Sequence, residues 1–113
     1  MRVLKDLSVD ATSAAGENQL ANRFVTSDKT VESTPSVRRR VVGITGRCSD
    51  TGYLKIIRGS AVVVTIDMAL LNALTFELPL DIDIIVGEPL SVYAVLDAGS
   101  AACAVALAIE EGT

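Results

Sequence analysis

The chain has 113 residues, half of them apolar, with a formal net charge of −4, few aromatic side chains and no histidine. This length allows one compact domain with its own core and is too short for two. Histidine is the commonest general base and metal ligand. Because the chain has none, we expect that it is not an enzyme and has no cofactor site.

The first 20 residues are interrupted by charges and lack the pattern of a secretory signal. The longest uncharged run, residues 98–109, is shorter than the roughly 20 residues that a membrane-spanning helix needs. We therefore expect no membrane partner.

Charge is distributed unevenly. All ten lysine and arginine residues lie within residues 1–58, together with six acidic residues, whereas residues 59–113 carry eight acidic residues and no basic one. Such a split can hold a basic segment of one copy against the acidic body of another copy, or against a separate acidic partner. The distribution favours assembly.

Residues 1–37 are polar and weakly patterned. Short strands are expected at Arg2–Val9 and Arg23–Thr26, and the remainder is expected to be extended arm or loop. The sequence thus predicts a polar N-terminal arm over 1–37 and a folded body over 38–113.

Two hairpins are expected between residues 41 and 68, with turns at "SDTG" (49–52) and at Arg58–Gly59–Ser60. Alternation predicts which side chains of these strands face the core: Val42, Ile44, Cys48, Leu54, Ile56, Val62, Val64, Ile66 and Met68. The following "ALLNALT" (69–75) shows no period of two and is expected to be a loop.

The strongest alternation is "FELPLDIDII" (76–85), which predicts a half-buried strand. Pro79 cannot donate a hydrogen bond to a neighbour, so we expect an edge strand or a strand that is broken at this residue. This strand and the next, "LSVYAVLD" (90–97), have these expected inward residues: Phe76, Leu78, Leu80, Ile82, Ile84, Leu90, Val92, Ala94 and Leu96.

The last stretch, "LDAGSAACAVALAIEE" (96–111), contains nine consecutive apolar residues. The "AGS" turn and the preceding strand predict a hairpin here, although alanine alone favours helix. One face would carry Cys103, Val105, Leu107 and Ile109 into the core. The opposite alanine face (Ala102, Ala104, Ala106 and Ala108) is predicted to lie under another chain or a covering segment.

Turn signals spaced about 8 to 12 residues apart, without an amphipathic helix between them, are typical of antiparallel sandwiches and barrels. We therefore expect an all-β fold, a single antiparallel β-sandwich that is jelly-roll-like and carries an extended N-terminal arm.

Few residues suggest reactive or metal-binding chemistry. Cys48 and Cys103 lack zinc spacing, so buried free thiols are expected, with one long-range disulfide as the alternative. Asp81 and Asp83 would point the same way from a strand and could hold the cation of a metal-dependent hydrolase. Hard cations need further oxygen ligands, so a solvated strand face and no metal are expected.

Arg38, Arg39 and Arg40 precede the first strongly patterned strand. Guanidinium groups suit carboxylates and phosphates. The chain has few aromatic residues for base stacking, so we expect no nucleic-acid partner. The arginines are interpreted as a solvated face or as a contact with an acidic protein neighbour.

The segments "GYLKIIRGS", "LPLDIDIIVGEPLSVYAV" and "AGSAACAVALAIEE" resemble those of the small β-sandwich proteins that decorate or cement the capsids of tailed bacteriophages and related viruses. The resemblance covers residues 38–111. It implies a structural virion protein, made in the host cytoplasm, that binds the major capsid protein and stabilises capsomer junctions. It also implies a homo-oligomer, with a trimer favoured, and transfers no catalytic or binding residue.

A second class remains open: a ligand- or carbohydrate-binding β-sandwich module of a tail or surface appendage. Sugar platforms usually stack saccharide rings on aromatic faces. The four aromatic residues of this chain are few, but Tyr53 and Tyr93 could form a small platform.

Overall fold

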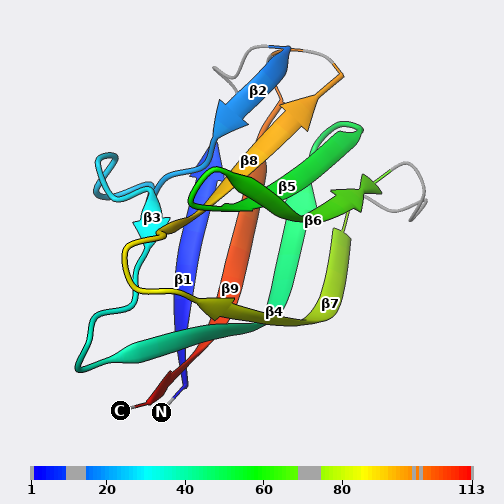
Figure 1. The fold of residues 1–113 in the computed structure, drawn as a ribbon. Helices are drawn as coiled ribbons and strands as arrows, with labels where there is room; N and C mark the ends of the chain where they lie inside the picture. Colours follow the sequence, from blue (N-terminus) through cyan, green and yellow to red (C-terminus); the bar gives the residue numbers. More distant parts are fainter. Residues whose placement is uncertain (1, 10–14, 69–74, 98, 100, 113) are drawn as a thin grey trace.

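The computed structural model describes residues 2–9, 15–68, 75–97, 99 and 101–112. They form two antiparallel sheets that pack face to face, which confirms the predicted sandwich (Figure 1). Sheet A contains, in spatial order, β1 (Arg2–Val9), β9 (Cys103–Gly112), β4 (Arg38–Cys48) and β7 (Thr75–Ile84). Sheet B contains β2 (Gly16–Gln19), β8 (Leu90–Leu96), β5 (Gly52–Arg58) and β6 (Ala61–Asp67), and β3 (Thr30–Val31) also pairs with β8. This strand order is that of a jelly roll.

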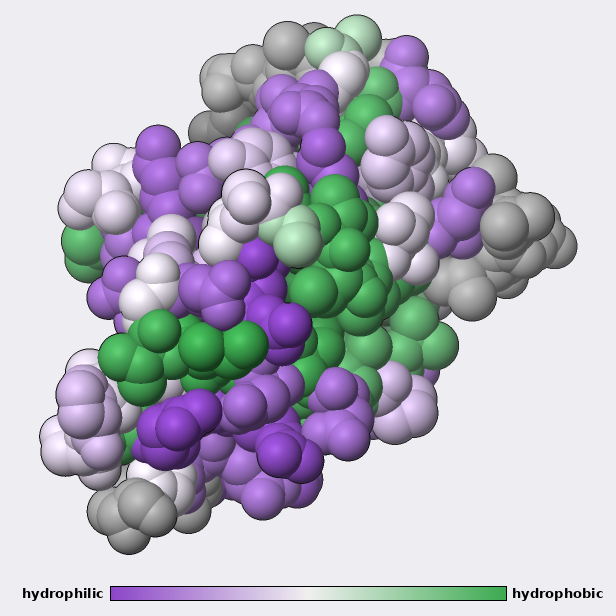
Figure 2. Space-filling view, in the orientation of Figure 1, coloured by the Kyte–Doolittle hydropathy of each residue, from purple (hydrophilic) through white to green (hydrophobic). Residues whose placement is uncertain are grey.

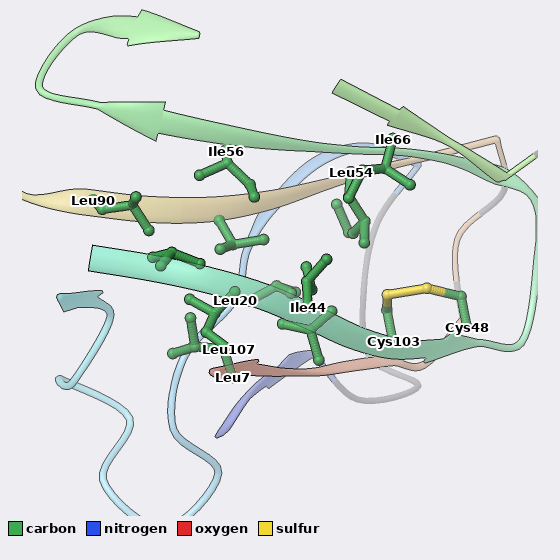
Figure 3. Close-up of a cluster of buried hydrophobic side chains, with 14 of the residues drawn as sticks. Leu7, Leu20, Ile44, Cys48, Leu54, Ile56, Ile66, Leu90, Cys103 and Leu107 are labelled. Carbon is green, nitrogen blue, oxygen red and sulfur yellow. A yellow bond between two sulfur atoms is a disulfide. The ribbon is translucent and has the colours of Figure 1, made fainter. Parts of the chain in front are cut away.

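The core lies between the sheets and is built from the inward side of nearly every strand (Figure 3). The two central strands of sheet A meet there through Ile44 and Leu107, which are Cα partners and are both fully buried. Sheet B contributes Leu54, Ile56 and Leu90 from the opposite side. Burial of this apolar surface is the main driving force for the fold.

The predicted alternation is confirmed in β5, β7, β8 and β9, where the expected inward residues are buried or half-buried. It fails at two β-bulges. In β4 the register shifts between Val41 and Gly43, so Val41 is buried in place of the predicted Val42. Where β5 pairs with β6, a similar shift leaves Val62 exposed instead of buried. One extra residue reverses the side-chain parity, and simple alternation contains no signal for it.

The turns are only partly as predicted. Arg58–Gly59–Ser60 closes a hairpin between β5 and β6, with Gly59 at a positive φ of 64°. The turn at 49–52 instead carries the chain from sheet A to sheet B, and the connection from β8 to β9 returns it, so neither closes a hairpin. Residues 69–74 of the predicted loop, and 98 and 100 of the predicted "AGS" turn, lie outside the described residues.

The described part of residues 1–37 belongs to the sandwich, which corrects the expected extended arm. The predicted strand Arg2–Val9 is confirmed as β1, which pairs along its whole length with β9. Leu7, Leu20 and Val31 are buried in the core. Arg23–Thr26 is a turn and not the predicted strand, since Asn22 Oδ1 accepts hydrogen bonds from the backbone N–H groups of residues 24 and 25.

A disulfide joins Cys48 of β4 to Cys103 of β9, which corrects the expectation of free thiols. The two residues are Cα partners across neighbouring strands, with their Cα atoms 4.1 Å apart. Both are buried, and Figure 3 shows the bridge at one end of the core. The two cysteines are 55 residues apart in the sequence, which gives no indication that they face each other on neighbouring strands.

The first and last strands are neighbours. Arg2 pairs with Glu110, so the two ends of the chain lie side by side (Figure 1).

Candidate functional site

Tyr53 and Tyr93 lie on the outer face of sheet B, on the neighbouring strands β5 and β8. Each tyrosine is next to a buried residue of its own strand, Leu54 or Ala94, and therefore points to the opposite face of the sheet. Tyr53 is the Cα partner of Val95, two residues from Tyr93, so the two tyrosines are diagonal neighbours. Diagonal positions on one sheet face are about 7 to 8 Å apart, within reach of aromatic side chains. The structure therefore brings the two predicted platform residues together.

Lys55 lies directly opposite Tyr93, and its ammonium nitrogen is 5.6 Å from the centre of that ring. The same nitrogen donates a hydrogen bond to Glu17 of β2. This hydrogen bond raises the pKa of Lys55 above its ordinary value, so the ammonium group stays charged at neutral pH. The contact holds a cation beside the aromatic ring in a favourable position.

The surroundings of the tyrosines are polar and open. Gln19 pairs with Tyr93 from β2, and Thr65 pairs with Lys55 from β6, so hydrogen-bonding groups flank the rings on both sides. Figure 2 shows this face of the molecule, with an apolar area over β6 and another over the segment that follows β7. Val62, Ile85 and Val86 are among the exposed large apolar residues. We call the surface formed by Tyr53, Tyr93, Lys55, Glu17 and Gln19 the tyrosine face.

The alanine face of β9 is on the outer side of sheet A, as the alternation predicts. Val105 and Leu107 are buried between the sheets, whereas Ala102 and Ala104 are exposed and Ala106 and Ala108 are half-buried. β1 and β4 flank the face on either side. Its predicted contact with another chain stays a prediction.

Arg38, Arg39 and Arg40 meet acidic residues of the same chain, because β4 lies between β7 and β9. Their partners are Asp83 at 3.5 Å, Glu111 at 2.7 Å and Asp81 at 3.0 Å, respectively. Arg39 also donates a hydrogen bond to the carbonyl oxygen of Glu32. The charge split along the sequence is thus partly matched within one molecule. A contact of these arginines with another protein stays a prediction.

Asp81 and Asp83 each have an arginine partner on β4. Across the described ranges, no group of three or more potential ligands could hold a metal ion. The part of the chain that the structure describes also contains no helix long and apolar enough to cross a membrane.

Sequence reasoning missed two further residues, Arg23 and Arg47, which line hollows that lie over part of the alanine face. Arg23 follows the bridge between Ser8 and Ala21, and Arg47 is the Cα partner of Ala104. Only the pairing of distant strands brings them together, and a single sequence carries no signal for that register.

No protein-family model matches the chain, and no curated protein matches it. Among solved structures, it is similar to the carbohydrate-binding module CBM36 in complex with calcium and xylotriose. The sequences are 14% identical, the TM-score is 0.40, and the alignment covers 93% of this chain and 98% of the other.

Proposed function

We propose that this chain is a non-catalytic carbohydrate-binding module and that it binds a saccharide through the tyrosine face. The observation that supports this best is the placement of Tyr53 and Tyr93 as diagonal neighbours on one open sheet face. Aromatic rings offer a flat apolar surface for the C–H face of a sugar, and each tyrosine hydroxyl adds a hydrogen-bonding group. Aromatic side chains at diagonal positions of one sheet face are close enough for both to contact one saccharide chain.

The polar neighbours suit the same ligand. Lys55 and Glu17 form an ion pair beside the Tyr93 ring, and Gln19 lies next to it on β2. Binding sites for small ligands combine apolar and aromatic surface with a few placed polar groups. The Cys48–Cys103 disulfide supports a module that works in an oxidising setting, such as a cell or virion surface.

Removal of either aromatic ring is expected to weaken saccharide binding. Tyr53→Ala and Tyr93→Ala should each lower the affinity for a bound glycan by about tenfold or more, because aromatic anchors dominate binding free energies. A glycan array identifies the ligand, and titration calorimetry measures the loss. Phe24→Ala removes a ring that is 80% exposed on the loop between β2 and β3, and should leave the affinity unchanged. Equal glycan binding by wild type and both tyrosine variants would refute the proposal.

A second candidate function is that of a self-associating structural subunit, such as a capsid decoration protein. The observation that favours it is the alanine face, a small-residue surface on the outer side of sheet A. Inner-facing apolar residues already satisfy the core, so a second apolar face on an antiparallel sheet suggests another protein surface.

If the alanine face is an interface between copies, Ala104→Glu or Ala106→Glu should disrupt assembly more than folding. Chromatography with light scattering should then show a smaller particle, while the unfolding midpoint changes little. Ala61→Glu, on an exposed residue of sheet B, serves as the matched control and should assemble normally. A wild-type monomer at micromolar concentration that also fails to bind capsids lacking it would exclude this function.

A further inference from the structure

Two adjoining hollows lie on the outer side of sheet A, with volumes of about 740 and 520 Å³. Both are lined by the same five residues: Ser8, Arg23, Arg47, Thr75 and Ala104. We call the combined depression the arginine groove. It is a different surface from the tyrosine face, which lies on the other sheet.

The floor of the groove is small and its walls carry hydroxyl groups. Ala104 and Ala106 line the floor, and their side chains are small and apolar. Thr45 lines one hollow, and Ser49 lines the other. Hydroxyl groups both donate and accept hydrogen bonds, which suits a ligand that is itself rich in hydroxyls.

The arginines of the groove differ from the others. In the described ranges, Arg23 and Arg47 are the arginines for which no acidic or carbonyl partner is found. The remaining five bond to a carboxylate or a backbone carbonyl: Arg2, Arg38, Arg39, Arg40 and Arg58.

Neither groove arginine is held away from solvent. The Arg23 guanidinium lies 4.7 Å from the centre of the Phe24 ring and remains exposed, as does Arg47. Asp6, at one end, is the acidic residue of the lining. Two guanidinium groups at one groove are suited to carboxylate, sulfate or phosphate oxygens.

The position of the groove selects the kind of polymer. Its floor is formed by β9 and β4, which are inner strands paired on both sides. An extended peptide adds to a sheet through the free backbone groups of an edge strand. The inner strands of the floor have none to offer, while the edge strands β1 and β7 contribute only the sides of the groove. Recognition over this floor therefore uses side chains, and the polar ones are guanidinium and hydroxyl groups together with the carboxylate of Asp6.

We propose that the arginine groove binds an acidic polysaccharide, with Arg23 and Arg47 contacting its carboxylate or sulfate groups. The inference does not rest on the tyrosine face. The net charge of −4 opposes general attraction of polyanions, so binding of one requires a local site.

Calorimetry and affinity electrophoresis with paired polymers test the proposal. The full chain should bind polygalacturonate more tightly than its methyl ester, or dextran sulfate more tightly than dextran, and the preferred pair identifies the anionic group. The double variant Arg23→Gln/Arg47→Gln should lose about tenfold or more of that affinity. Added salt should weaken wild-type binding, because both arginines are exposed.

Arg40→Gln is the matched control, because it removes an exposed arginine from the same strand as Arg47 but outside the groove. It should retain wild-type affinity. Loss of affinity as large as that of the double variant would show unspecific attraction and overturn the proposal. Equal affinity of the wild type for charged and neutral polymers would also overturn the proposal. So would a wild-type dimer that binds no polyanion and that the double substitution converts to a monomer. The variant Tyr53→Ala/Tyr93→Ala should bind the polyanion normally, which separates this site from the proposed function of the tyrosine face.

Discussion

Removal of the Cys48–Cys103 disulfide is expected to lower the free energy of unfolding by about 4 kcal/mol. In the chain-entropy model, a cross-link that closes a loop of this length restricts the unfolded chain strongly. The loop spans 55 residues and includes four strands, β5 to β8. A loss of this size is a large fraction of the stability of a typical domain. Urea unfolding of Cys48→Ala/Cys103→Ala, compared with oxidised wild type, measures it.

Reduced wild type provides the control, because it lacks the cross-link but keeps both sulfur atoms in the core. Its unfolding midpoint should fall close to that of the double variant, with the remaining difference due to the lost side-chain volume. Identical midpoints for oxidised and reduced wild type would contradict the expected role of the bridge.

Leu107→Ala is expected to lower the free energy of unfolding by about 2 to 5 kcal/mol, the usual cost of a cavity at a fully buried leucine. Leu107 is completely buried in β9 and faces the opposite sheet. β9 is an inner strand at the centre of sheet A. We therefore expect the surrounding side chains to relax little into the cavity. Thermal or urea unfolding followed by circular dichroism gives the value.

Leu4→Ala is the matched control because it makes the same chemical change on the same sheet. Leu4 is 70% exposed on β1, where it pairs with Ala108. Its replacement should change stability by no more than about 0.5 kcal/mol. Comparable losses for the two leucines would mean that the assigned inner and outer faces of sheet A are wrong.

Alternation along the sequence was enough to identify most strands of the body and their inward sides. The pattern from Phe76 to Ile84 predicted an edge strand because of Pro79, and β7 is an edge of sheet A. Polarity alone does not indicate whether a turn closes a hairpin or carries the chain to the other sheet. The turn at 49–52 was therefore misread, although its residues were correctly identified as a turn.

The N-terminal strands show a different limit. β2 and β3 are short, and residues 16–19 read "GENQ", which has neither apolar alternation nor β-branched side chains. They are held in place by backbone pairing with β8 and by single anchors such as Leu20. Tertiary context of this kind outweighs local propensity and leaves little trace in the sequence.

The candidate sites were predictable only where one strand carries the signal. Alternation predicts that the alanine face points outward and that Tyr53 and Tyr93 lie opposite the buried residues of their strands. The structure places them accordingly. The ion pairs of Arg38, Arg39 and Arg40 depend instead on β4 lying between β7 and β9. The arginine groove likewise needs the register of four strands and a loop, which no single segment encodes.

The pairing of β1 with β9 places the start of β1 and the end of β9 side by side on the surface, with Arg2 opposite Glu110. A polypeptide with adjacent ends can be circularly permuted: a short flexible linker can join them, and the exposed hairpin turn at Gly59 offers a place for new ends. The same geometry suits insertion of the whole sandwich into a surface loop of a host protein, since the host chain would enter and leave it at neighbouring positions. The tyrosine face and the arginine groove would then both remain displayed, one on each side of the inserted unit.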